Sequence, residues 1–272
     1  MLEPFLVGWP VLRDVVMKAM AARGHLVLCE LENARFFVDP GDRVVGAWLM
    51  WHGGWQRREI EAAVELLTSA GRLPADPIFI DIGAHIGTHT VYALRTGRFV
   101  RAVAFEPEPR NARLLAMNIE ANGLSQAVIV ARKAAGAEPG SGTLYLHPRN
   151  TGAHAMDVPP AIDGEHALEV PIVRVEDELA ALEIPLEKVG LVWIDAEGYE
   201  PQVLDGLKAL IVRSVPIAFE FTPRRYSGEM KERLVELLAR HYTTVHSLGR
   251  QEGSAPIRSL AAREHTDDVL VY

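Results

Sequence analysis

From residue 77 onward, short apolar runs alternate with longer stretches in which apolar residues recur at helical spacing. The apolar runs predict seven strands, at residues 78–80, 101–105, 127–131, 191–194, 216–221, 243–246 and 269–272. Helical spacing predicts helices at residues 88–94, 109–121, 202–211 and 229–240. Continuous apolar strands separated by amphipathic helices are typical of a mostly parallel sheet that is covered on both faces. The pattern therefore predicts an α/β fold.

The residues before this region show a different pattern. Apolar spacing predicts a helix at residues 11–22, β-prone runs at 25–29 and 35–38 predict a hairpin, and an amphipathic helix follows at 57–70. We therefore expect two parts: an accessory helix and hairpin at residues 1–55, and the main domain at residues 56–272.

One long connection interrupts the alternation of strands and helices. Residues 137–175 are rich in Pro and Gly, with β-prone segments at their two ends. A connection of this length in a compact domain is more often functional than idle. We therefore expect it to lie near a substrate.

Composition narrows the class of protein. The 272 residues carry 28 Lys and Arg against 36 Asp and Glu, a net charge of −8, which disfavours nucleic acid as the main partner. The single Cys29 forbids an intrachain disulfide, and no apolar run approaches the roughly 20 residues that span a bilayer. We expect a cytoplasmic protein without a membrane or nucleic-acid partner, and its oligomeric state stays open.

The candidate chemistry begins directly after the first predicted strand. There the chain reads Asp81-Ile82-Gly83-Ala84-His85-Ile86-Gly87 and opens a helix, so the glycines would let a ligand approach the backbone at the helix N-terminus. Glu106 follows Asp81 by 25 residues and ends the next strand, where an acidic residue can hold ribose hydroxyls. This pattern predicts a nucleotide-like ligand.

The order of this loop is Asp-x-Gly-x-x-x-Gly, which differs from the dinucleotide fingerprint Gly-x-Gly-x-x-Gly. An acidic residue two positions before the first glycine suits a ligand with an ammonium group and would repel a pyrophosphate. Charge therefore favours S-adenosylmethionine over NAD.

Several motifs in one order resemble the FkbM-type S-adenosylmethionine-dependent methyltransferases. They are FIDIGAHIG at 79–87, AFEPEP at 104–109, Asn118 with NGL at 122–124, VEDEL at 175–179, WIDAEGYE at 193–200 and AFE at 218–220. The resemblance spans roughly residues 52–221. His85 stands where the family usually has Asn.

The resemblance implies a class I methyltransferase core, a Rossmann-like doubly wound sheet of seven strands with the last one antiparallel. It also implies that S-adenosylmethionine binds over the carboxyl ends of the strands. The residues expected to hold it are Glu59, Asp81, Gly83, Ala84, His85, Gly87, Glu106, Pro107 and Asp195.

Methyl transfer to a hydroxyl needs a base near the methyl group. Asp195, at the carboxyl end of the fourth strand, is the first candidate, and His154 and Glu220 are further candidates. A divalent ion is not required by the spacing; if one binds, we expect Asp195, Glu197 and Glu220 to hold it.

The acceptor is inferred from an absence. Methyltransferases that act on exocyclic amines of nucleobases commonly carry Asn/Asp-Pro-Pro-aromatic after the fourth strand, whereas this chain reads Asp195-Ala196-Glu197-Gly198-Tyr199. We expect O-methylation of a hydroxyl on a small metabolite, sugar or natural product. Two alternatives stay open: an NAD-dependent oxidoreductase or epimerase, and a non-catalytic protein that binds S-adenosylmethionine or a metabolite.

Overall fold

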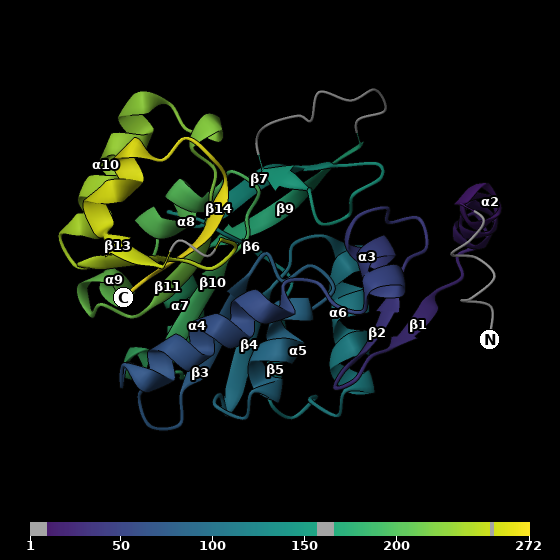
Figure 1. Cartoon of the computed structure of the whole chain (residues 1–272), viewed down its shortest axis with the longest axis horizontal. Coiled ribbons are helices and arrows are strands. Elements are labelled where there is room, and N and C mark those ends of the chain that lie inside the picture. Colours follow the sequence, from purple (N-terminus) through teal and green to yellow (C-terminus); the bar gives the residue numbers. More distant parts are fainter. Residues whose placement is uncertain (1–9, 157–165, 251–252) are drawn as a thin grey trace.

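The main sheet of the computed structural model has the predicted parallel core. The structure describes residues 10–156, 166–250 and 253–272. The sheet has the order β13-β12-β14-β11-β10-β3-β4-β5 (Figure 1). Its strands are β3 (Ile78–Ile82), β4 (Arg101–Phe105), β5 (Val128–Ala131), β10 (Val189–Ile194), β11 (Ile217–Phe221), β12 (Thr244–Ser247), β13 (Ser254–Pro256) and β14 (Asp267–Val271).

Five strands, from β11 through β10, β3 and β4 to β5, pair in parallel, and β14 pairs antiparallel with β11 and β12. The seven predicted strands and the antiparallel last strand are therefore confirmed. The short edge strand β13, which pairs with β12, was not predicted.

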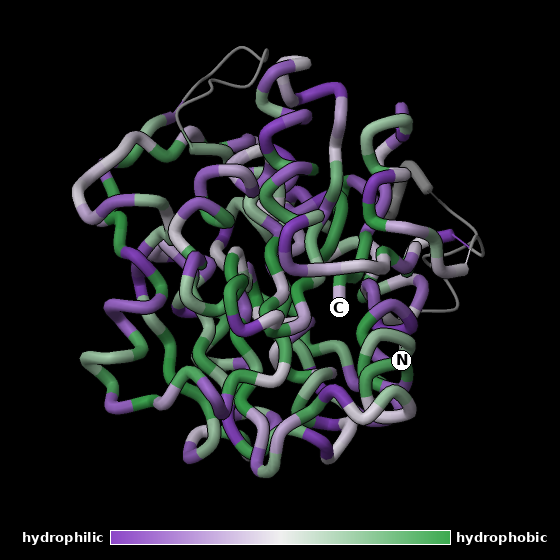
Figure 2. Tube along the Cα trace, turned by 90° about the vertical axis from the view of Figure 1, so that its left-hand side faces the viewer, coloured by the Kyte–Doolittle hydropathy of each residue, from purple (hydrophilic) through white to green (hydrophobic). Residues whose placement is uncertain are grey.

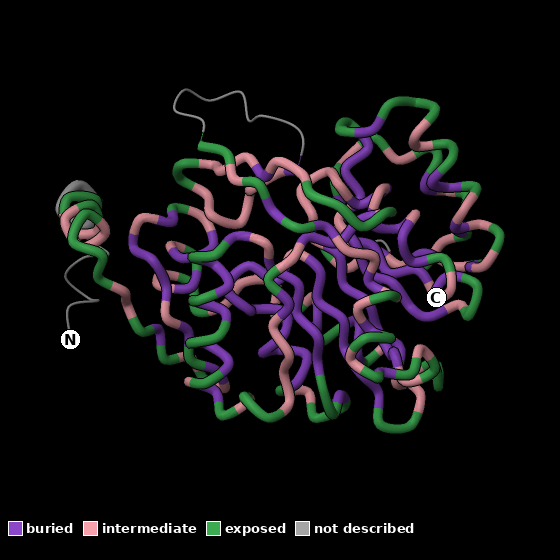
Figure 3. The backbone as a smooth tube through the Cα atoms, turned by 180° about the vertical axis from the view of Figure 1, so that it is seen from behind, coloured by how far each residue is buried: buried purple, intermediate pink, exposed green. Residues whose placement is uncertain are grey.

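Alternate residues of each strand point to opposite faces of the sheet, and helices bury both faces. Ile78, Ile80 and Ile82 belong to one apolar cluster, and Phe79 belongs to the other. The first face is covered by α7 (Val175–Ala181), α8 (Glu200–Asp205), α9 (Lys208–Val212) and α10 (Gly228–Ala239), and the second by α4 (Arg57–Ser69), α5 (Thr88–Arg95) and α6 (Pro109–Ala121). Buried and apolar segments accordingly fill the centre of the molecule (Figures 2 and 3). The single helix expected at 202–211 is two short helices, α8 and α9.

The N-terminal hairpin packs on the second face. It consists of β1 (Val27–Glu30) and β2 (Arg35–Val38), and α3 (Val45–His52) follows it. Asn118 of α6 accepts a hydrogen bond from the Phe37 amide at 2.6 Å and donates to the Ile86 carbonyl at 2.8 Å. Phe36 and Leu49 lie in the same apolar cluster as α5 and α6. Helix α2 (Pro10–Ala21) lies beyond β1 at the edge of the molecule (Figures 1 and 3).

The predicted hairpin is thus present, and it shares its buried cluster with the main sheet. Residues 1–9 of the expected accessory segment lie outside the described residues. The division of the chain at residue 55 stays a prediction.

The long connection forms a second, smaller sheet with the order β6-β9-β7-β8. Its strands are β6 (Ala134–Ala135), β7 (Gly140–Leu146), β8 (Ala155–Met156) and β9 (His166–Val173). Residues 157–165 of the connection lie outside the described residues. Three short 3-10 turns complete the chain: η1 (Leu186–Lys188), η2 (Pro223–Arg225) and η3 (Ile257–Ala262). Within the described ranges, no helix has the length and apolar character needed to cross a membrane.

Candidate active site

The strand order reverses between β3 and β10, which is where open α/β sheets place their ligands. The loop after β3 turns sharply there, because Gly83 has φ +79° and Gly87 has φ +90°. A Cβ on Gly83 would collide with the carbonyl oxygen of Asp195, at the end of β10. Gly83 therefore lets the two strand ends approach each other.

His85 also adopts the left-handed conformation, with φ +50°. Asn and His are among the residues that tolerate it best. The replacement of the family's usual Asn by His85 is therefore compatible with this backbone.

Glu106 lies beside this loop and is 5% exposed. Its carboxylate accepts hydrogen bonds from the His85 amide and the Glu108 amide, both at 2.8 Å. Burial raises the pKa of Glu106 to about 8, although both amides favour the ionised form. Each carboxylate oxygen keeps acceptor capacity for a further donor such as a ribose hydroxyl.

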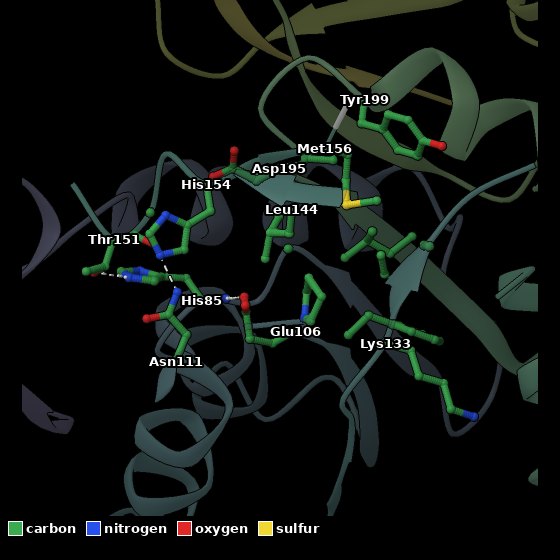
Figure 4. A pocket seen from close by; sticks show the side chains of 18 residues that line it. His85, Glu106, Asn111, Lys133, Leu144, Thr151, His154, Met156, Asp195 and Tyr199 are labelled. Carbon is green, nitrogen blue, oxygen red and sulfur yellow. Dashed lines mark hydrogen bonds between the residues drawn. The ribbon is translucent and has the colours of Figure 1, made fainter. Parts of the chain in front are cut away.

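Two hollows open above the strand ends. The first, which we call the Glu106 pocket, has Glu106 in its lining (Figure 4). The second, which we call the Trp55 pocket, has Trp55 in its lining. Four residues line both hollows, namely Gly83, His85, Gly152 and Asp195. These four therefore lie at the boundary between the two spaces.

The Asp195 carboxyl group is the acidic side chain at this boundary. No other described residue forms a hydrogen bond to it. Burial, followed by the charge of Glu197, raises the pKa of Asp195 well above its ordinary value. A raised pKa makes the ionised carboxylate a stronger proton acceptor than an ordinary aspartate.

The loop that carries Asp195 is held by other acidic side chains. Glu200 is fully buried and accepts hydrogen bonds from the Ala196 amide at 3.1 Å and the Gly198 amide at 3.0 Å. Glu197 pairs with Arg225 at 2.6 Å and lines the Trp55 pocket. These contacts shape the loop around Asp195.

Glu220 lies away from both hollows. Its carboxylate accepts a hydrogen bond from the Thr222 hydroxyl at 3.0 Å and is 3.9 Å from Arg225. Glu220 affects the site electrostatically, because its charge contributes to the raised pKa of Asp195. The geometry therefore does not favour Glu220 as the base.

In the part of the chain that the structure describes, no group of three or more His, Cys, Asp or Glu side chains is placed to hold a metal ion. The suggested set of Asp195, Glu197 and Glu220 does not form such a group. Two of its members are engaged instead, Glu197 by Arg225 and Glu220 by Thr222.

His154 lines the Glu106 pocket, as expected for a residue of the long connection. Its Nδ1 accepts a hydrogen bond from the His147 amide at 3.0 Å. Burial lowers the pKa of His154 to about 4, so the ring is neutral at pH 7 and carries its one hydrogen on Nε2. His154 therefore offers the pocket a donor, and this geometry disfavours it as a proton acceptor.

Asp81 lies beneath the glycine loop and is fully buried. Thr90 of α5 donates a hydrogen bond to its Oδ2, while Oδ1 has no hydrogen-bond partner among the described residues. Burial raises the pKa of Asp81 to about 7. Because Asp81 lines neither the Glu106 pocket nor the Trp55 pocket, its first role in this geometry is to fix the start of α5.

The remaining predicted cofactor residues are spread around these hollows. Pro107 lines the Glu106 pocket and Ala84 lines the Trp55 pocket. Gly87 packs against Leu115 of α6. Glu59 lies on a separate surface hollow that shares Trp55 with the Trp55 pocket.

Sequence reasoning missed three residues near the site. Thr151 lies 2.8 Å from the His85 ring and donates to Asp42 at 3.0 Å, and Asn111 donates to the Thr151 carbonyl at 2.9 Å. The one available signal was the expectation that the long connection lies near a substrate. It did not indicate which side chains would meet.

The groups that line the site fit the predicted cofactor. Glu106 presents a carboxylate to one hollow, and the glycine loop brings backbone close to the boundary where Asp195 lies. Among known protein families, the methyltransferase FkbM domain matches residues 81–250. The chain belongs to the FkbM methyltransferase family. Membership confirms the resemblance seen in the sequence and, with it, the prediction of S-adenosylmethionine as the cofactor.

One curated relative of this FkbM chain is Methyltransferase 1 of Beauveria bassiana. It is 29% identical over 151 residues, which cover 49% of this chain and 59% of the relative. The match thus spans less than two thirds of the relative's own length.

Solved structures resemble the FkbM chain more distantly. The O-methyltransferase from Bacillus cereus in complex with SAH is 15% identical, with a TM-score of 0.40 over 78% of this chain and 90% of that one. A precorrin-6y C5,15-methyltransferase from Geobacter metallireducens is 14% identical, with a TM-score of 0.40 over 78% and 86%. The tRNA m1G37 methyltransferase of M. jannaschii is 10% identical, with a TM-score of 0.43 over 90% and 53%. Sequence identities and TM-scores this low say nothing about the methyl acceptor of this chain.

Proposed function

We propose that this protein is an S-adenosylmethionine-dependent methyltransferase that methylates a hydroxyl group on a small metabolite, sugar or natural product. The observation that carries the proposal is the placement of Asp195. Its free carboxyl group lies where the Glu106 pocket and the Trp55 pocket meet, within a chain of the FkbM family.

In this proposal the Glu106 pocket holds the nucleoside part of the cofactor. The Glu106 carboxylate accepts hydrogen bonds from ribose hydroxyls, while the His85 and Glu108 amides keep it in place. Leu144, Met156 and Tyr199 add apolar and aromatic surface to the same hollow, which suits a planar base. When bound, S-adenosylmethionine supplies a methyl group on a positively charged sulfur.

The Trp55 pocket holds the acceptor, on the other side of the boundary residues. Asp195 receives the proton that the acceptor hydroxyl loses as its oxygen bonds to the methyl carbon. Glu200 keeps the Asp195 loop in shape through two backbone amides, so the base is positioned before the acceptor arrives. The net charge of −8 supports a small-molecule acceptor over nucleic acid.

The first test is calorimetric titration with S-adenosylhomocysteine, with NAD as the parallel control. Micromolar binding of S-adenosylhomocysteine alone supports the proposal, whereas tight binding of NAD alone favours the oxidoreductase alternative.

The second test follows release of S-adenosylhomocysteine from S-adenosylmethionine with a panel of hydroxylated metabolites, with and without magnesium. Asp195→Asn should lower turnover by about 10²–10⁴ while leaving S-adenosylhomocysteine affinity unchanged. Binding without turnover for every acceptor would favour a non-catalytic protein.

A further inference from the structure

Three segments that are far apart in the sequence meet at the side chain of His85. His85 lies in the loop after β3, Thr151 lies between β7 and β8, and Asp42 lies just before α3. The Thr151 hydroxyl is 2.8 Å from Nε2 of His85 and donates a hydrogen bond to Oδ2 of Asp42 at 3.0 Å. The three side chains form a continuous chain of hydrogen bonds, and its end at His85 and Thr151 is visible in Figure 4.

The direction of this chain follows from Asp42. Its carboxylate is 2% exposed and accepts hydrogen bonds from the Val44 and Gly46 amides, each at 3.0 Å. Both Asp42 oxygens accept from backbone amides, and Oδ2 also accepts the single hydroxyl hydrogen of Thr151. The Thr151 oxygen must then accept a hydrogen bond from His85 Nε2–H.

Since a neutral imidazole carries one hydrogen, this arrangement leaves Nδ1 of His85 with a free lone pair. Burial lowers the pKa of His85 to about 4, so the ring is neutral at pH 7. No described residue donates a hydrogen bond to Nδ1.

Contacts within the protein hold Thr151 in place. Asn111 donates to the Thr151 carbonyl at 2.9 Å, which fixes the backbone on the far side of the hydroxyl. Gly152 follows, and a Cβ there would approach Val45 to 3.3 Å, so this stretch packs closely against α3. These contacts fix the backbone that carries Thr151, the residue that meets the His85 ring.

His85 and Asp195 are the two titratable side chains that line both hollows. Under the proposed function, Asp195 takes the proton of the reacting hydroxyl. One hydroxyl donates one hydrogen bond, so a second acceptor at the same boundary calls for a second donor on the acceptor molecule.

We propose that Nδ1 of His85 accepts a hydrogen bond from a hydroxyl next to the one that is methylated, and that the acceptor carries neighbouring hydroxyls. In this scheme His85 determines specificity, and Thr151 and Asp42 are positioning residues that fix its tautomer. The inference rests on the proposed function.

The tautomer is tested by nitrogen NMR of the full chain labelled with ¹⁵N-histidine and saturated with S-adenosylhomocysteine. The His85 signals are assigned by their loss in His85→Asn. We expect His85 as the Nε2–H form alone, in the wild type and in Thr151→Ser, which keeps the hydroxyl. Thr151→Val should give a mixture of the two tautomers. A wild-type ring with hydrogen on Nδ1, or an unchanged tautomer in Thr151→Val, would overturn the positioning role.

The specificity is tested on the same sample with two matched pairs of probes at millimolar concentration: catechol against phenol, and cis-cyclohexane-1,2-diol against cyclohexanol. A diol of either pair should shift the Nδ1 signal of His85 at least threefold more than its monohydroxy partner, and Asp195→Asn should retain this difference. Equal shifts within both pairs, or no shift with any probe, overturn the proposal. A matching shift with 2-aminophenol but not with catechol would assign the second donor to an amine and overturn it too.

Failure of the proposed function gives a different result. In that case no hydroxylated acceptor causes release of S-adenosylhomocysteine from S-adenosylmethionine, whatever the tautomer of His85. Binding of S-adenosylhomocysteine with the wrong tautomer would leave the proposed function standing and reject this inference alone.

Discussion

Replacing Glu106 by Gln tests how the cofactor's ribose is held. The Glu106 carboxylate accepts the His85 and Glu108 amides at 2.8 Å each. In Glu106→Gln the side-chain NH₂ faces one of these N–H donors, and the charge-assisted bonds to ribose are lost. Hydrogen bonds to a charged group contribute about 1.5–3 kcal/mol, so S-adenosylhomocysteine affinity should fall about tenfold or more.

The assay is calorimetric titration of the wild type and the variant with S-adenosylhomocysteine. Glu65→Gln is the matched control, because Glu65 is an exposed residue of α4 and its replacement removes the same charge. Urea unfolding of both variants shows whether the fold is kept. An affinity for Glu106→Gln within threefold of the control, with the fold intact, would refute the assignment of the ribose contact.

Three further predictions follow from the site. Because burial raises the pKa of Glu106 to about 8 and the ionised form is the one that accepts from both ribose hydroxyls, S-adenosylhomocysteine affinity should fall with a slope of up to tenfold per pH unit below that pKa and level off near the affinity of Glu106→Gln. Titrations from pH 9 to pH 6 should show this slope for the wild type and none for Glu106→Gln. Asp195→Asn should lower kcat by about 10²–10⁴ and leave S-adenosylhomocysteine affinity unchanged, as measured by product release and calorimetry; parallel losses of both would contradict its role as base. Gly83→Ala should destabilise the fold by about 2–5 kcal/mol in urea unfolding, because the new Cβ combines a positive φ with a collision against the Asp195 carbonyl. Gly97→Ala is the control, because Gly97 has φ +70° and nothing lies within 4 Å of the new Cβ, so it shows the cost of backbone strain alone. Equal losses of unfolding free energy in the two variants would contradict the close approach of β3 and β10.

The main sheet was predictable because its strands are buried on both faces and therefore appear as continuous apolar runs. Strand β13 gave no such signal, since its residues are exposed or half-buried. Helix α3 was missed for the opposite reason: Val45–His52 is apolar nearly all round, so it lacks the polar face that marks an amphipathic helix. The break between α8 and α9 arises where Gly206 packs against the backbone of Gly136, a contact that local spacing cannot reveal.

Some residues of the candidate site were also predictable from the sequence, and others were not. The glycine loop and Glu106 follow strand ends, so a parallel sheet predicts that they meet at one edge. Asp42 and Thr151 are 109 positions apart and neither ends a strand of the main sheet, so no periodicity connects them. The engagement of Glu220 by Thr222 and of the His154 Nδ1 by a backbone amide also depends on local loop geometry, which sequence spacing does not describe.

The strand order of the main sheet means that the part of the chain matching the FkbM domain is not a folding unit by itself. The match ends at residue 250, yet β14 (Asp267–Val271) lies between β11 and β12 and hydrogen-bonds to both. At the other end, Asn118 inside the match bonds to Phe37 outside it. A chimera that grafts residues 81–250 onto another methyltransferase would therefore separate two sheet strands and uncover the hairpin side of α6. Exchange of acceptor specificity between relatives is better attempted within the β7–β8 connection, with both ends of the chain retained.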